Sequence, residues 1–145
     1  MAANMGIAPM KPGTGRQVLV VEEQMMPMLL AEEVLLAEGY RVATAANFHG
    51  ATRAMTTCDD EAVVLDLHLA DSSSLLLADE FIELGIPMLF ASTRTEARLP
   101  DRFGDALILH KPYLPEELLV GVSTLFMQRS KQGPTTPAVN ETSCR

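Results

Sequence analysis

The chain of 145 residues has only two cysteines, few basic residues and no long apolar run. Cys58 and Cys144 cannot form a disulfide scaffold, and no spacing of Cys and His resembles a zinc site. The longest apolar runs stay well short of the ~18 residues that a membrane span needs. The first 15 residues contain no continuous apolar stretch, so we expect no secretory signal. These absences predict a soluble, cytoplasmic protein with no membrane partner.

Basic residues are outnumbered, because 11 Lys and Arg stand against 19 Asp and Glu, for a net charge of -8. The acidic surplus lies within residues 16–129, which carry eight basic and 18 acidic residues and a formal charge of -10. Such a segment repels DNA phosphates, so the charge pattern argues against a nucleic-acid partner. It favours a divalent cation or a basic protein surface instead.

What the chain does contain is enough apolar sequence for one folded domain. Hydrophobic residues make up 48% of the chain and its mean hydropathy is +0.14, which excludes wholesale disorder. We expect the domain over residues 16–129. Residues 1–15 are rich in Gly, Pro and Met, and residues 130–145 mix Pro, Thr and Ser, so both segments are expected to be flexible tails.

Five short apolar runs alternate with segments of helical spacing. The expected strands are residues 17–21, 41–45, 61–65, 86–91 and 105–109. The expected helices are residues 24–39, 49–56, 72–84, 94–101 and 115–129, with Gly39 and Gly85 ending the first and third. The strands recur about every 20 to 25 residues, the length of a strand plus a crossover helix. The sequence therefore predicts an α/β fold, a doubly wound parallel sheet covered by helices on both faces.

Polar side chains stand at the ends of four of these runs. Glu22 and Glu23 follow the first strand, Asp66 the third, Ser92 the fourth and Lys111 the fifth. Ligands of open α/β sheets bind outside the carboxyl ends of the strands. Three carboxylates there favour a hard divalent cation such as Mg²⁺. A cation, an Asp, a hydroxyl and a Lys are also the groups that receive a phosphoryl group.

Each of these residues also has a purely structural interpretation, as a solvated loop residue or a helix cap. Their conjunction resembles the response-regulator receiver domain of two-component signalling over residues 16–129. The segments that carry the resemblance are VLVVEE (18–23), VVLDLHLAD (63–71), PMLFAS (87–92) and LHKPY (109–113). The resemblance implies a flavodoxin-like five-stranded sheet in the order 2-1-3-4-5. Within the family, the chain resembles an alphaproteobacterial subgroup whose fourth strand reads Phe-Ala-Thr-Gly-Tyr.

The resemblance assigns a role to each residue of the site. Asp66 would be the phosphoacceptor, Ser92 the hydroxyl switch, and Lys111 the conserved lysine of the family, followed by Pro112, which the family often holds in a cis peptide. Mg²⁺ would contact Glu23, Asp66 and the backbone carbonyl of His68, with Glu22 nearby through water.

Several positions depart from the family pattern, among them Glu23, Thr93 and Ile108. Glu23 is one methylene longer than the usual Asp, and this difference affects a cation that demands near-ideal octahedral geometry. Thr93 replaces a usual Ala or Gly and narrows access to the acceptor. Ile108 replaces the usual aromatic switch residue, so aromatic rotation cannot be the output mechanism; the Phe-Ala-Thr-Gly-Tyr subgroup also lacks this aromatic.

The resemblance implies a stand-alone response regulator that accepts phosphate from a sensor histidine kinase or a phosphotransfer protein. We expect no enzymatic activity beyond its own phosphorylation and dephosphorylation. Because little chain follows residue 129, we expect its output to be contact with a downstream protein. Three alternatives stay open: a binding module that works without phosphorylation, a flavodoxin-like FMN protein, and an enzyme that uses the same aspartate on a small phosphate ester.

Overall fold

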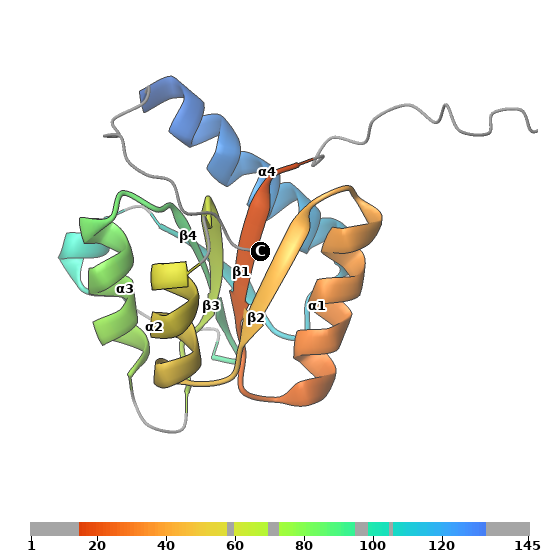
Figure 1. Ribbon diagram of the computed structural model, residues 1–145, viewed down its shortest axis with the longest axis horizontal. Coiled ribbons are helices and arrows are strands. Elements are labelled where there is room, and N and C mark those ends of the chain that lie inside the picture. Colours follow the sequence, from red (N-terminus) through yellow and green to blue (C-terminus); the bar gives the residue numbers. More distant parts are fainter. Residues whose placement is uncertain (1–14, 58–59, 70–72, 95–98, 105, 133–145) are drawn as a thin grey trace, which may run out of the picture.

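The computed structural model describes residues 15–57, 60–69, 73–94, 99–104 and 106–132. They form one parallel five-stranded sheet in the order β2-β1-β3-β4-β5, with helices packed on both faces (Figure 1). The strands are β1 (Gln17–Val21), β2 (Arg41–Ala45), β3 (Ala62–Asp66), β4 (Met88–Ser92) and β5 (Leu107–His110). The helices are α1 (Met25–Ala37), α2 (Phe48–Thr57), α3 (Ser74–Glu83) and α4 (Pro115–Gln132), with one 3-10 turn, η1 (Asp101–Phe103). The predicted class, strand order and two-sided helix cover are confirmed.

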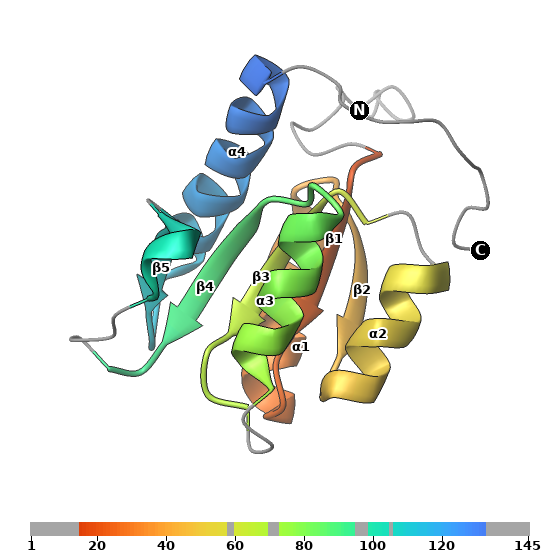
Figure 2. The same cartoon turned by 90° about the vertical axis from the view of Figure 1, so that its left-hand side faces the viewer.

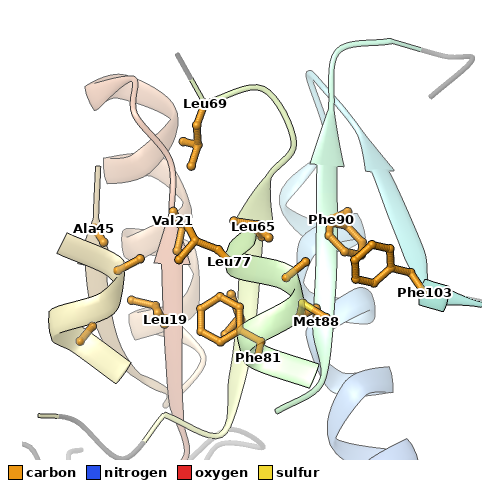
Figure 3. Packing of buried hydrophobic residues seen from close by; sticks show 14 residues of the cluster. Leu19, Val21, Ala45, Leu65, Leu69, Leu77, Phe81, Met88, Phe90 and Phe103 are labelled. Atoms are coloured by element: carbon orange, nitrogen blue, oxygen red, sulfur yellow. The ribbon is translucent and has the colours of Figure 1, made fainter. Parts of the chain in front are cut away.

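The central strands β1, β3 and β4 are buried along their whole length. Successive side chains of a strand point to opposite faces of the sheet. Leu19 and Val21 of β1 therefore join the core under α2 and α3, while Val18 and Val20 join the core under α1 and α4. Figure 2 shows α2 and α3 side by side on one face, and Figure 3 shows Phe81 of α3 among the apolar side chains of that core.

Two glycines end helices where the sequence predicts it. Gly39 follows α1 with a φ of 98°, and Gly85 follows α3 with a φ of 75°. Both lie in the left-handed region, which glycine enters without the steric cost of a Cβ. Their backbone N–H groups bond to carbonyls near the helix ends, Leu36 for the first and Ile82 for the second.

The connection between β4 and β5 differs from the helix predicted over residues 94–101. Leu99 and Pro100 are not helical, and residues 95–98 lie outside the described part of the chain. The proline ring disfavours helical backbone at the residue before it. The single turn η1 is followed by Gly104, whose φ is 56°. Within the described residues no α-helix lies between β4 and β5, and β5, an edge strand, is only partly buried.

The remaining boundaries shift by a few residues. Strands β3 and β4 end at Asp66 and Ser92, so both site residues belong to strands rather than to the loops that follow. Helix α4 continues to Gln132, past its predicted end at residue 129; residues 1–14 and 133–145 of the expected tails are outside the described residues. No helix in the described ranges is both long enough and apolar enough to cross a membrane.

Candidate functional site

The carboxyl ends of four strands meet at one edge of the sheet. Asp66 ends β3 and Ser92 ends β4, while Glu22 follows β1 and Lys111 follows β5. The backbone N–H of Lys111 donates to the carbonyl of Ser92 at 2.7 Å, which extends the β4–β5 ladder by one residue. Because all strands are parallel, their polar end residues share this edge. Glu22, Asp66, Ser92 and Lys111 therefore occupy one edge, as the sequence predicts.

The ammonium group of Lys111 connects two buried carboxylates. Its Nζ lies 2.7 Å from Glu22 Oε1 and 3.5 Å from Asp66 Oδ1. The side chains of Glu22 and Asp66 are only 6% and 5% exposed, and that of Lys111 is 14% exposed. Two carboxylates against one ammonium leave this group one negative charge in excess, in surroundings where charges are poorly hydrated.

The electrostatic strain of this arrangement is visible at Glu22. Burial raises the pKa of the Glu22 carboxyl above its ordinary value, and the charge of Asp66 adds to the rise. Hydrogen bonds from Lys111 and from the backbone N–H of Gln24 act in the opposite direction, because they stabilise the ionised form. The edge therefore favours additional positive charge or the loss of one negative charge.

The carboxyl and the carbonyl of Asp66 are both held by neighbouring groups. The backbone N–H of His68 donates to Asp66 Oδ1 at 2.9 Å. The hydroxyl of Ser74 donates to the carbonyl oxygen of Asp66 at 2.7 Å and accepts a long hydrogen bond from Leu69 N–H. Ser73, at the N-cap of α3, makes no side-chain capping hydrogen bond to the helix, and Ser74 instead ties α3 to the end of β3. Nothing in the local sequence distinguishes this serine from its neighbours.

Ser92 is fully buried and its hydroxyl has three close neighbours. Oγ lies 2.8 Å from Nε2 of His68, accepts from the backbone N–H of Arg94 at 3.0 Å, and lies 3.4 Å from the Arg94 carbonyl. The sequence pointed to His68 only for its backbone carbonyl. The structure shows that the imidazole itself contacts the hydroxyl, although the residue as a whole is exposed.

The other predicted residues differ in their exposure to solvent. Glu23 and Thr93 are exposed, and Ile108 is partly buried against the core under α2 and α3. The Lys111-Pro112 peptide is cis, in agreement with the family pattern. Tyr113, next along the chain, packs against the other core, and burial together with the nearby carboxylates raises the pKa of its phenol to about 12.

The carboxylates of Glu22, Glu23 and Asp66 do not form one close cluster of three ligands. In the described part of the chain, no three His, Cys, Asp or Glu side chains lie close enough together to hold a metal ion. Glu22 is engaged by Lys111, and Glu23 is exposed on the loop before α1. Mg²⁺, however, binds through one or two carboxylates and keeps several waters. The hard oxygen donors of Asp66 and of the His68 carbonyl, beside an edge with excess negative charge, fit that chemistry; the ligand set stays a prediction.

Comparison with known sequences supports the assignment that the motifs suggest. No protein-family model matches the chain. The transcriptional regulatory proteins PrrA of Mycobacterium tuberculosis and Mycobacterium bovis are each 29% identical to it over 136 residues. The match covers 89% of this chain and 56% of each PrrA, so the chain spans about half the length of the curated relatives it matches.

Solved structures show the same fold. A CheY-like response regulator receiver domain from Methanospirillum hungatei superposes with a TM-score of 0.70 at 20% identity, covering 81% of this chain and 98% of that one. The response regulator TrrA of Thermotoga maritima, solved in complex with Mg²⁺ and BeF, gives 0.67 at 24% identity, covering 76% and 98%. The resemblance to the Phe-Ala-Thr-Gly-Tyr subgroup stays a prediction.

Proposed function

We propose that this chain, which has the fold and the sequence resemblance of a response-regulator receiver domain, accepts a phosphoryl group on Asp66. The donor is a phosphohistidine of a sensor histidine kinase or of a phosphotransfer protein. The observation that carries the proposal is the ammonium group of Lys111 held between Glu22 and Asp66 at a buried edge, with the Ser92 hydroxyl at the end of the next strand.

The transfer needs a nucleophile that is held in place. Both contacts found for the Asp66 carboxylate within the described residues are made by Oδ1, which leaves Oδ2 to attack phosphorus. A P–O bond forms as the P–N bond of the donor breaks, and the electron pair stays on the donor imidazole, which takes up a proton from water. Attack of water on the same phosphorus later releases phosphate and restores the carboxylate.

The neighbouring groups then stabilise the phosphoryl oxygens. Lys111 supplies a positive charge and Ser92 a hydroxyl donor, both of which matter most in a poorly hydrated site. Asp66 and the His68 carbonyl, with Glu23 on the adjacent loop, would hold Mg²⁺. The cation would neutralise charge on the phosphoryl oxygens. TrrA, solved with Mg²⁺ and BeF, supports this part of the proposal by analogy.

The proposed output is a change of affinity for a downstream protein, with the chain acting in the cytoplasm and catalysing only its own phosphorylation and dephosphorylation. A phosphoryl group on Asp66 would draw Ser92 and Lys111 toward it and shift the population of conformers at the β4–β5 edge. The net charge of -10 over residues 16–129 supports a protein rather than a nucleic-acid target.

A second candidate is a binding module that works without phosphorylation. Lys111 lies closer to Glu22 than to Asp66, and the Ser92 hydroxyl already has partners, so the resting edge is partly satisfied without a phosphoryl group. A flavodoxin-like FMN site has no such support, since the buried carboxylate of Glu22 stands where the phosphate would bind.

Labelling with acetyl phosphate separates these candidates. We expect the wild-type chain to gain the mass of one phosphoryl group in the presence of Mg²⁺, and to lose the label when Mg²⁺ is chelated. Asp66→Asn should abolish labelling, whereas Asp79→Asn, a matched change at an exposed carboxylate on α3, should leave it intact. If no phosphodonor labels the chain at millimolar Mg²⁺, the proposal that Asp66 is a phosphoacceptor is refuted. Titration of Mg²⁺ with Glu23→Asp then tests whether the longer carboxylate weakens cation binding.

A further inference from the structure

His68 touches both sides of the proposed acceptor site. Its backbone N–H donates to Asp66 Oδ1 at 2.9 Å, and its ring nitrogen Nε2 lies 2.8 Å from Ser92 Oγ. One residue thus connects the carboxylate that would be phosphorylated with the hydroxyl that would bind the phosphoryl group. The first contact belongs to the backbone and survives substitution, whereas the second depends on the imidazole.

The Ser92 hydroxyl has a single proton to donate. Oγ accepts from the backbone N–H of Arg94 at 3.0 Å, and among the described residues its proton has two acceptors within reach, the Nε2 of His68 and the Arg94 carbonyl. The imidazole contact is 2.8 Å and the carbonyl contact is 3.4 Å, so the ring offers the shorter of the two hydrogen bonds. A hydrogen bond from the hydroxyl to the ring requires the tautomer with its proton on Nδ1, in which Nε2 accepts.

Burial makes this partner important. Ser92 is 0% exposed, and a buried hydroxyl that loses its partner cannot replace it with bulk water. His68, by contrast, is exposed, so its ring can exchange the hydroxyl for solvent at little cost. The two ends of this hydrogen bond therefore respond differently when a phosphoryl group arrives.

We infer that the His68 imidazole is a positioning residue that holds the Ser92 hydroxyl in the resting protein and competes with the phosphoryl group for its proton. The inference rests on the proposed phosphoacceptor function. Phosphorylation would transfer the hydroxyl from imidazole to phosphoryl oxygen and release the ring to water. Removing the ring acceptor would weaken the resting arrangement only, and so shift the equilibrium toward the phosphoryl-bound conformer.

Beryllofluoride with Mg²⁺, which mimics an aspartyl phosphate, provides the test, with binding followed by amide NMR spectra. We expect His68→Leu to bind beryllofluoride about three- to tenfold more tightly than wild type, the effect of one side-chain hydrogen bond. His68→Gln, whose amide retains an acceptor of similar reach, should stay closer to wild type. His49→Leu, a matched change at an exposed histidine on α2, should have no effect.

The Ser92→Ala background isolates the route through the hydroxyl. If His68 acts through Ser92, then His68→Leu should change the affinity there by less than about twofold, whereas a general effect on the pocket would persist. The ring nitrogen shifts of His68 should also change on Ser92→Ala in the protein without beryllofluoride, and this readout needs no phosphoryl chemistry.

The outcomes distinguish the two proposals. Unchanged ring shifts, or equal tightening with and without Ser92, would overturn the positioning role while leaving Asp66 as the acceptor. Failure of the wild-type chain to take up either beryllofluoride or phosphoryl group would overturn the acceptor function and the role of His68 with it.

Discussion

Replacing Lys111 with methionine tests the electrostatics of the site most directly. Glu22 Oε1 and Asp66 Oδ1 lie 2.7 and 3.5 Å from the same Nζ, so these oxygens are at most 6.2 Å apart. At an effective dielectric constant of about 20, two charges at that separation repel by about 3 kcal/mol. Water at the edge of the sheet weakens this repulsion. We therefore expect Lys111→Met to lower the free energy of unfolding by about 2 kcal/mol at pH 7.

This loss in the free energy of unfolding should depend on pH, and the direction of the dependence follows from the pKa of Glu22. Without the ammonium group, the Glu22 carboxyl keeps a folded-state pKa above its unfolded value, in the direction already seen with Lys111 present. The folded state then binds more protons than the unfolded state, so stability falls as pH rises through the folded-state pKa of Glu22. Below the unfolded pKa the Glu22 carboxyl is neutral in either state. The loss caused by Lys111→Met should therefore shrink as pH falls from 7 toward 4.5.

Urea unfolding followed by far-UV circular dichroism measures both effects. In the Glu22→Gln background one negative charge is gone, so Lys111→Met should destabilise the protein by at least about 1 kcal/mol less. Glu33→Gln, on the exposed face of α1, is the matched control and should show no coupling with Lys111. A coupling energy near zero between Glu22 and Lys111, or an equal loss at pH 4.5 and pH 7, would refute the reasoning.

Further predictions concern packing, the phenol and the surface. Gly121→Ala should destabilise the fold by about 1 kcal/mol or more in urea unfolding, because its Cβ would lie 2.7 Å from Leu89 Cδ2. In the Leu89→Ala background this loss should be smaller, and additive effects of the two substitutions would contradict the clash. Tyr113 should ionise near pH 12, as measured by absorbance at 295 nm. Because its phenol has a higher pKa in the folded than in the unfolded state, the protein should lose stability as pH rises from about 10 toward 12. Ionisation near pH 10 would instead show the phenol to be hydrated. Arg102→Ala removes an exposed ion pair with Asp79 and should leave the urea midpoint unchanged within error.

The parts of the fold that the sequence predicts are those with dense apolar patterns. The predicted strands at residues 17–21 and 61–65 are short and mostly apolar, and burial on both faces follows from that composition. The segment between β4 and β5 has no such pattern. The helix predicted over residues 94–101 has little support in the sequence, and Pro100 and Gly104 oppose helical backbone there. Local composition thus predicts helices and strands with a dense apolar pattern, whereas segments without one depend on their tertiary contacts.

The residues of the site also differ in how well the sequence predicts them. Asp66, Ser92 and Lys111 can be found from the sequence, because each stands at the end of an apolar run and parallel strands end at one edge. Adjacent acids are harder to separate: Glu22 is buried against Lys111 while Glu23 is exposed, and only the direction of the chain leaving β1 decides which carboxylate turns inward.

The sequence alone therefore predicts the class of the fold, the order of its elements along the chain and the edge of the sheet at which Asp66, Ser92 and Lys111 lie. The tertiary structure alone decided that Lys111 pairs more closely with Glu22 than with Asp66, that Ser74 ties α3 to β3, and that the ring of His68 reaches Ser92. The difference arises because sequence patterns report local burial, whereas these contacts join separate segments of the chain. Apolar periodicity records the burial of each residue along its own strand or helix, whereas a hydrogen bond between side chains of different elements depends on loop paths and rotamers that no local pattern encodes.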